Sequence, residues 1–468
     1  MIYLFSKNNL DKLVFIFLIT YPIFDLIFFY NSFTTIIRMF IVIFFTIWLL
    51  VINKDFQKKF KWILVYFVIL LIYAIFHHIN ALNFKSLMPG NFYYLKLKEL
   101  LYLFKYSIPL LFMYFLYYLK LDKKYYFKIL KFWIIFISGS IIITNLFKIS
   151  LGSYSNEIIK GNIFNWFNTN LTYYDLASKG LFMYANQISC ILVCLIPIIY
   201  HLFTNKKIKL YYLVILMISL LMLGTRVANI GGIIALFLSI TIYLFFVIIK
   251  KEKFEFKSLL YSLIVIIISA LILPFSPTMN RYKIFNYILE VNSKVYYATS
   301  EQQIKIDYIR KNYQEKQIYP LFILERYPYQ YDPDFWYDIM QLDYSYRANY
   351  RYLEISMLER VKKINNNKWD DWLGITNVRV QNIFNVERDF LLQYYCFGII
   401  GSIILLLVYI LILFKNIFNF IKSFCYKNAI MVLITSLFLL ISYFTGNILS
   451  QLGIPIMYIF VNNFDIDN

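Results

Sequence analysis

Apolar stretches, each long enough to cross a bilayer, follow one another along most of this chain. A transmembrane helix needs roughly 17–25 predominantly apolar residues. The residues are 61% hydrophobic, well above the roughly 45–50% of soluble domains. The pattern therefore predicts an all-α polytopic membrane protein with about 12 transmembrane helices. The predicted spans are Leu13–Tyr30, Ile36–Ile52, Trp62–Ile79, Leu100–Leu119, Tyr125–Phe147, Leu181–Phe203, Leu210–Gly224, Val227–Ile249, Ser258–Phe275, Leu391–Phe414, Ala429–Thr445 and Ile448–Val461.

One long polar segment, Ser276–Phe390, interrupts these spans. It divides the chain into an N-terminal membrane domain of about nine spans, residues 1–275, a large loop, residues 276–390, and C-terminal spans, residues 391–468. Within the loop, apolar residues recur every three or four positions from Ser345 to Ile364, which predicts a helix. Because only this loop has both the polar residues and the volume for a reaction site, we expect the function to depend on it.

The net charge of +20 could indicate a nucleic-acid-binding protein, but the positions of the charges argue against it. The long loop is nearly neutral, with 16 Lys and Arg against 15 Asp and Glu. Cytoplasmic loops of membrane proteins are enriched in Lys and Arg, so we expect no nucleic-acid partner, both termini inside and the large loop outside. The lysine-rich loops alternate along the chain at residues 7–12, 54–61, 120–131, 206–209, 250–257 and 415–427.

The four cysteines do not predict a disulfide framework. Cys190 and Cys194 lie in one predicted span, and the long loop has no cysteine. No zinc site or other metal centre is predicted from this spacing.

Three features together resemble a known family. A dozen spans surround one large outer loop, Asn186 opens a middle span, and the turn Gly224-Thr225-Arg226 joins two spans. This arrangement is similar to the O-antigen ligase and polymerase family. The resemblance implies a glycosyltransferase of the bacterial cytoplasmic membrane that uses undecaprenyl-diphosphate-linked glycans and no cofactor. It also implies the lipid bilayer, a flippase and a chain-length regulator as partners.

The family's signature at the end of the large loop is His followed by Asn, Ser or Gln, then nine residues, Gly, two residues, and Gly, Thr or Tyr. This sequence has Glu387-Arg388, nine residues, and then Gly398 and Gly401 separated by two residues. The spacing is kept and the His is replaced. In the ligases that His is the candidate base for the acceptor, so the resemblance leaves Glu387, or Asp389, as the base here.

Glycosyl transfer from a lipid diphosphate needs cations for the developing phosphate charge and a base for the acceptor hydroxyl. Arginine suits the first task because its planar fork pairs with two phosphate oxygens. Arg226 lies in a short turn at the outer membrane surface. We interpret it as a diphosphate ligand; the alternative is an interfacial side chain that reaches lipid phosphates.

Three loop arginines extend the predicted diphosphate site. Arg347 and Arg351, four residues apart on the predicted helix, are expected to share a face and form a clamp. They could instead form surface ion pairs. Arg388 lies beside the signature, where it could bind phosphate or pair with Glu387.

Other polar residues near the span ends have less specific interpretations. Asn186 needs a hydrogen-bond partner inside a span, and helix–helix bonding explains it as well as catalysis does. His77 and His78 are distant in sequence from the signature, so we expect them to be interfacial.

The leading functional hypothesis is a polymerase of lipid-linked repeat units for a capsular or other surface polysaccharide. The alternative enzyme is a ligase that passes a finished glycan to another acceptor; the missing His favours the polymerase. A lipid-linked oligosaccharide flippase or other transporter is a different class. Transporters place charged sites near the membrane midplane, whereas the charges here lie in the loop and at the rim.

Overall fold

The computed structural model is mainly helical in the part of the chain that it describes, with turns and irregular segments between the helices and two isolated β-bridges. A helix pairs all its backbone groups internally, which is what a membrane-spanning segment requires. The described residues are 6–27, 31–82, 95–167, 171–250, 254–281, 302–316, 318, 320–377, 386 and 388–463.

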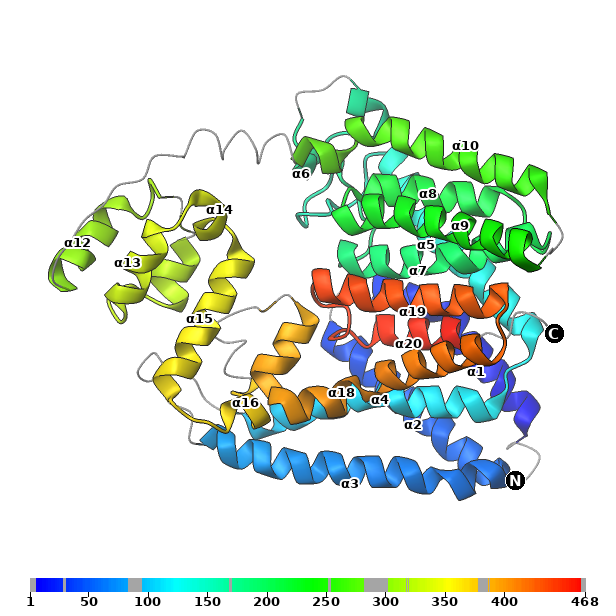
Figure 1. Ribbon diagram of the computed structural model, residues 1–468, viewed down its shortest axis with the longest axis horizontal. Helices are drawn as coiled ribbons and strands as arrows, with labels where there is room; N and C mark the ends of the chain where they lie inside the picture. Colours follow the sequence, from blue (N-terminus) through cyan, green and yellow to red (C-terminus); the bar gives the residue numbers. More distant parts are fainter. Residues whose placement is uncertain are drawn as a thin grey trace. The chain divides into compact units, whose positions relative to one another are not determined.

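The first group of helices ends where the large loop begins (Figure 1). It consists of α1 (Lys7–Ile27), α2 (Asn31–Ile52), α3 (Lys54–Leu82), α4 (Lys96–Leu119), α5 (Lys123–Leu146), η1 (Ile163–Phe167), α6 (Tyr173–Leu176), α7 (Ala185–Thr204), α8 (Tyr211–Leu223), η2 (Val227–Gly231), α9 (Gly232–Lys250), α10 (Phe256–Ile272) and η3 (Leu273–Phe275).

The loop and the C-terminal part supply the remaining elements. They are α12 (Gln302–Asn312), η4 (Leu321–Arg326), α13 (Pro333–Gln341), α14 (Tyr344–Arg347), α15 (Tyr350–Asn365), α16 (Asp370–Leu373), α18 (Asp389–Lys422), α19 (Tyr426–Phe444) and α20 (Gly453–Asn462).

Within the described residues, nine helices are long and apolar enough to span a membrane, and α8 and α20 are shorter apolar helices. The predicted class of all-α polytopic membrane protein is therefore confirmed. The figure of 12 spans stays a prediction.

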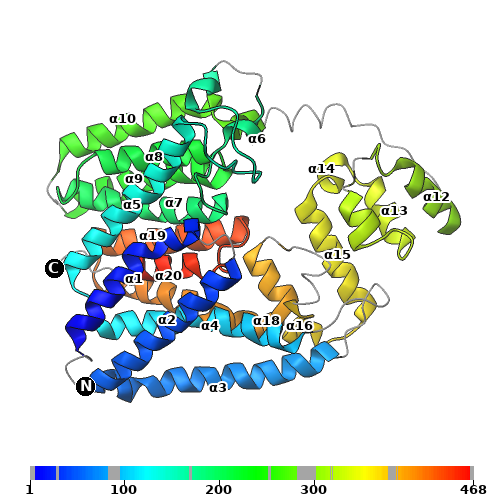
Figure 2. The same ribbon diagram turned by 180° about the vertical axis from the view of Figure 1, so that it is seen from behind.

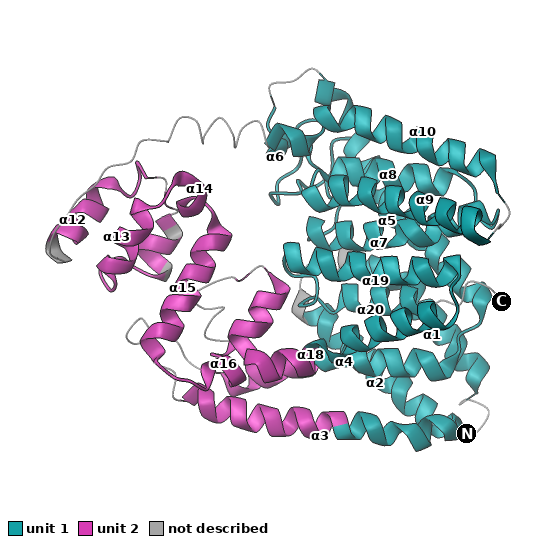
Figure 3. Cartoon of the chain, in the orientation of Figure 1, with its two compact units in different colours: residues 1–65, 105–282, 406–468 teal, residues 66–104, 283–405 magenta. Residues whose placement is uncertain are grey.

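The chain divides into two compact units (Figure 3). Unit 1 comprises residues 1–65, 105–282 and 406–468, and unit 2 comprises residues 66–104 and 283–405. Unit 2 thus joins most of the large loop to parts of α3, α4 and α18.

Helix α7 is the centre of unit 1. Its most apolar window is 94% buried, as expected for a helix that is hydrophobic on all sides. It packs against α8, α9, α19 and α20 (Figure 1). Helix α1 packs on α2 and α5, which is seen best from behind (Figure 2).

The described part of the loop folds around its aromatic residues. Trp336 is fully buried, and its indole Nε1 donates to the Tyr327 carbonyl at 2.7 Å. Asp332 accepts from the Phe335 amide at the start of α13 and pairs with Arg360 of α15 through two hydrogen bonds of 2.6 and 3.0 Å. This bidentate pair ties the two helices together.

The helix predicted from Ser345 to Ile364 is two helices. Helix α14 ends at Arg347, and the Asn349 side chain then accepts from the Arg351 amide as the N-cap of α15. The prediction that Arg347 and Arg351 share one helix face is therefore wrong, because a new helix starts between them. The predicted stop is confirmed: Asn366 caps α15 in the left-handed conformation, with φ +46°.

Candidate functional site

The Gly224-Thr225-Arg226 turn in unit 1 is closely packed. Gly224 ends α8 with φ +62°, and a Cβ there would lie 2.7 Å from Ala177 Cβ and 2.9 Å from Pro277 Cβ. Only glycine fits that conformation and that space. The Tyr154 hydroxyl donates to the Gly224 carbonyl at 2.8 Å and fixes the turn from the opposite side.

Thr225 starts the helix that follows the turn. Its hydroxyl accepts from the Ala228 amide at 3.1 Å and lies 3.0 Å from the Ser189 hydroxyl of α7. Asn229 then donates to the Thr278 hydroxyl at 2.7 Å. Arg226 is exposed between these fixed residues, at the N-terminus of a helix, where the peptide dipoles favour an anion.

A second arginine, Arg281, lies against the same tyrosine. Its guanidinium carbon is 4.8 Å from the centre of the Tyr154 ring and 5.5 Å from that of Tyr173. Burial raises the pKa of Tyr154, while the charges of Arg281 and Arg226 oppose that rise. Tyr154 therefore lies within the electrostatic range of both guanidinium groups.

Arg281 is not among the residues predicted from the sequence, because it falls within the range of the predicted large loop. The helical segment Phe256–Arg281 carries it as its last residue. The signal was available: Arg281 comes only six residues after the apolar span ends at Phe275.

Asn186 lies in the first turn of α7 and is half-buried. Its neighbour Gln187 donates to the Asn447 carbonyl at 3.1 Å, which connects this end of α7 to the segment after α19. A catalytic role for Asn186 stays a prediction.

In unit 2, Arg347 is 3% exposed. Its Nε donates to the Lys316 carbonyl and its Nη1 to the Leu342 carbonyl, both at 2.9 Å. Burial lowers its pKa. Through these bonds, Arg347 connects its own helix to the segments that carry Lys316 and Leu342. Its contact with a diphosphate stays a prediction.

Arg351 and Arg388 meet near the start of α18. Arg388 Nη2 donates to the Arg351 carbonyl at 3.3 Å, and both side chains are half-buried. Glu387 lies outside the described residues. Asp389, the first residue of α18, is fully buried.

The signature glycines of unit 2 allow two backbones to cross. Gly398 has φ +66° and ψ −173° inside α18, and a Cβ there would lie 2.4 Å from the Trp372 carbonyl carbon. Gly374, on the other chain segment, would place a Cβ 2.2 Å from the Cys396 carbonyl oxygen. At Gly401, a Cβ would lie 2.3 Å from the Tyr73 hydroxyl. The signature spacing thus serves close packing of α3, α16 and α18.

His77, expected at the membrane interface, is 1% exposed, so its ring is packed inside the protein; its depth in the membrane stays a prediction. Its Nδ1 lies 2.6 Å from the Leu373 carbonyl, which can only accept, so Nδ1 carries a proton. Its Nε2 lies 2.9 Å from Glu99 Oε1, which also accepts from the Asn377 amide at 2.9 Å. A single sequence gives no sign of this pairing, because the partners of His77 come from α4 and from residues 373–377, both far from His77 in the chain.

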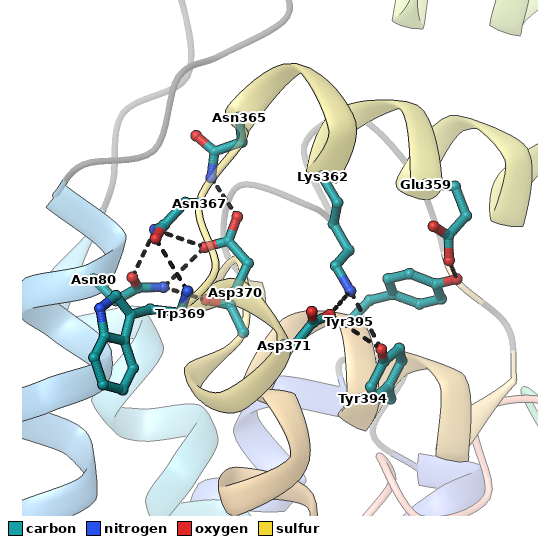
Figure 4. Close-up of polar contacts among 11 residues, drawn as sticks. Asn80, Glu359, Lys362, Asn365, Asn367, Trp369, Asp370, Asp371, Tyr394 and Tyr395 are labelled. Carbon is teal, nitrogen blue, oxygen red and sulfur yellow. Dashed lines mark hydrogen bonds and ion pairs between the residues drawn. The ribbon is translucent and has the colours of Figure 1, made fainter.

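A polar network fixes the end of the loop (Figure 4). Buried Asp370 accepts from Asn80 of α3 and from Asn367, each at 3.0 Å, and from Asn365. Its neighbour Asp371 pairs with Lys362 of α15. Burial raises the pKa of Asp370, whereas the Lys362 ammonium lowers that of Asp371.

Among the described residues, no group of three or more His, Cys, Asp or Glu side chains could hold a metal ion.

Comparison with known proteins gives one match. The family model of O-antigen ligase like membrane proteins matches residues 7–466. The chain belongs to this family. No curated protein and no solved structure matches it. Membership assigns this O-antigen ligase-like protein a ligase- or polymerase-type role in glycan assembly, as a glycosyl-transferring membrane enzyme.

Proposed function

We propose that this protein polymerises undecaprenyl-diphosphate-linked oligosaccharide units into a surface polysaccharide. The observation that carries the proposal is the cationic turn of unit 1. Exposed Arg226 is held by a turn that Tyr154 closes, and Arg281 lies on the ring of the same tyrosine.

In the proposed donor step, Arg226 and Arg281 hold the diphosphate of the lipid-linked glycan. A diphosphate leaving group develops charge as its bond to the anomeric carbon breaks, and a fixed guanidinium stabilises that charge without reorganising. The packing of Gly224 and the cap at Thr225 support this role, since they fix the backbone that carries Arg226.

In the proposed acceptor step, a sugar hydroxyl of one lipid-linked unit attacks the anomeric carbon of another chain. The hydroxyl proton passes to the Glu387 carboxylate, the new glycosidic bond forms, and undecaprenyl diphosphate leaves with the electrons of the broken bond. Glu387 is proposed as this base because it occupies the place of the signature His, whereas the alternative, Asp389, is fully buried.

Glycan analysis of a deletion strain separates the polymerase from the ligase. Loss of long chains with single repeat units retained is the result expected of a polymerase. Accumulation of long chains still attached to the lipid would assign the ligase role instead.

The side of the membrane is tested with reporter fusions. The lysine distribution predicts that a reporter near Asn365 lies outside and one near Lys253 inside. Both reporters on one side would refute the topology on which the proposal depends.

A further inference from the structure

Unit 1 has a cavity of about 770 Å³ at the ends of α4, α5, α18, α19 and α20. This volume is within the range of ligand sites, roughly 300–1,000 Å³. Among the described residues, Lys120, Lys123, Lys415 and Lys427 line it together with five asparagines and one carboxylate, Asp122. These residues belong to loops that the charge pattern assigns to the cytoplasmic side.

The one carboxylate of the lining is already paired. Asp122 caps α5 by accepting from the Lys124 amide at 3.0 Å, and its other oxygen lies 2.9 Å from Lys124 Nζ. Lys124 is not part of the lining. The described carboxylate of the lining is thus engaged with a lysine outside the cavity, whereas Lys120, Lys123 and Lys415 bring positive charge to it.

The same helix that supplies Lys415 has an apolar outer face beside the cavity. Leu411, Phe414, Phe418 and Ile421 recur every three or four residues on α18 and are 41–73% exposed. Lys415 follows Phe414 directly and lies 5.7 Å from the ring of Tyr117, another lining residue. A phosphate group in the cavity would thus have apolar helix surface next to it.

We propose that this cavity binds the headgroup of an anionic phospholipid of the inner leaflet. The lysine ammonium groups pair with the lipid phosphate, Asn419 hydrogen-bonds to the headgroup, and the acyl chains lie along the exposed face of α18. A soluble phosphate compound could pair with the same lysines, but it has no acyl chains that would contact the apolar face of α18. The inference does not depend on the proposed polymerase activity.

Native mass spectrometry of the purified full chain tests the site by titration with phosphatidylglycerol and with phosphatidylcholine. Each lysine near an anionic surface contributes roughly fivefold in affinity, so the double variant Lys415→Gln, Lys427→Gln should bind phosphatidylglycerol about 25-fold more weakly. The matched control is Lys58→Gln, Lys59→Gln, which removes the same charge from exposed positions outside the cavity. Its affinity should be unchanged.

Two further variants keep the test decisive if the first variant does not fold. Lys415→Arg with Lys427→Arg should retain binding, and Lys120→Gln with Lys123→Gln should weaken it about 25-fold, as in the first variant. Equal weakening by cavity and control pairs, or no preference for phosphatidylglycerol over phosphatidylcholine, would overturn the proposal. Glycerol phosphate bound as tightly as phosphatidylglycerol would overturn the assignment to a lipid.

Discussion

The sequence suggests both Arg226 of unit 1 and Arg347 of unit 2 for phosphate binding, but the two side chains differ in their exposure to solvent. Arg226 is exposed on a turn whose backbone is fixed by Gly224, Thr225 and Tyr154. Arg347 is buried and donates to two backbone carbonyls. Burial against two backbone carbonyls makes Arg347 part of the packed fold, whereas the exposure of Arg226 lets it meet a ligand.

Substitution of a tightly packed glycine of unit 2 is expected to have the largest effect, because it disrupts the packing of the fold itself. Gly398→Ala should abolish accumulation of folded protein, because the new Cβ meets backbone atoms and the φ and ψ values are open to glycine almost alone. Gly139→Ala is the control, since nothing lies within 4 Å of its Cβ position in α5. Protein level and thermal unfolding in detergent are measured. Equal levels of both variants would contradict the backbone crossing.

Glu387→Gln should give the next largest effect, since it keeps the size of the side chain and removes the proton acceptor. Loss of a general base costs about 10²–10⁴ in rate, so polymer should nearly vanish at a normal protein level. The rival explanation is an ion pair with Arg388. Rescue by Glu387→Arg combined with Arg388→Glu would favour that pair over the base.

Arg226→Lys tests the exposed arginine directly. A lysine keeps the charge but loses the bidentate fork, and hydrogen bonds to charged groups are worth about 1.5–3 kcal/mol, or roughly 10–100-fold in rate. Polymer synthesis per folded molecule should fall by that factor. Polysaccharide of wild-type length from the Arg226→Lys variant would instead support the alternative, in which Arg226 is an interfacial side chain that contacts lipid phosphates.

Arg347→Lys is the matched change in unit 2 and should behave in the opposite way. It leaves at least one buried carbonyl without its donor, at a cost of about 1–3 kcal/mol in local stability. Limited proteolysis should cut the loop faster, while polymer formed per intact molecule stays unchanged. A fall in activity as large as that of Arg226→Lys would break the distinction between the two arginines.

Asp371→Asn should have the smallest effect, because its side chain is 52% exposed and surface ion pairs contribute less than about 1 kcal/mol. Lys362 lowers the pKa of Asp371, so the contribution is present above the ordinary carboxyl pKa and is lost as the pH falls through the lowered one. The difference in unfolding temperature from wild type should therefore disappear in acid. A difference that persists in acid would exclude this ion pair as its cause.

The contribution of Asp370 to folding stability should change with pH in the opposite direction, although Asp370 is adjacent to Asp371 in the chain. Burial raises its pKa, so its protonated form is favoured in the folded state, and that contribution is lost as the pH rises through the raised pKa. Nothing in the sequence distinguishes the two carboxylates, because burial against Asn80 of α3 is a long-range event.

The sequence by itself determined the membrane class, the end of α15 at the asparagine run and the short turn that carries Arg226. Each of these follows from local composition, because a span needs a continuous apolar run and a turn needs glycine. Family membership was also visible locally, in the spacing from Glu387 to Gly401.

Only the tertiary structure decided which polar residues work together. In the folded chain, Arg281 lies against the ring of Tyr154, and buried His77 contacts Glu99. A new helix begins at Asn349, so Arg347 and Arg351 belong to different helices. Four lysines from separate helices and connections line one cavity. Most of these contacts join segments far apart in the chain. The exception is Asn349, which caps a new helix inside a stretch whose apolar spacing predicts one continuous helix. Pairing energy of this kind depends on distance in space and on exclusion of water, neither of which residue spacing records.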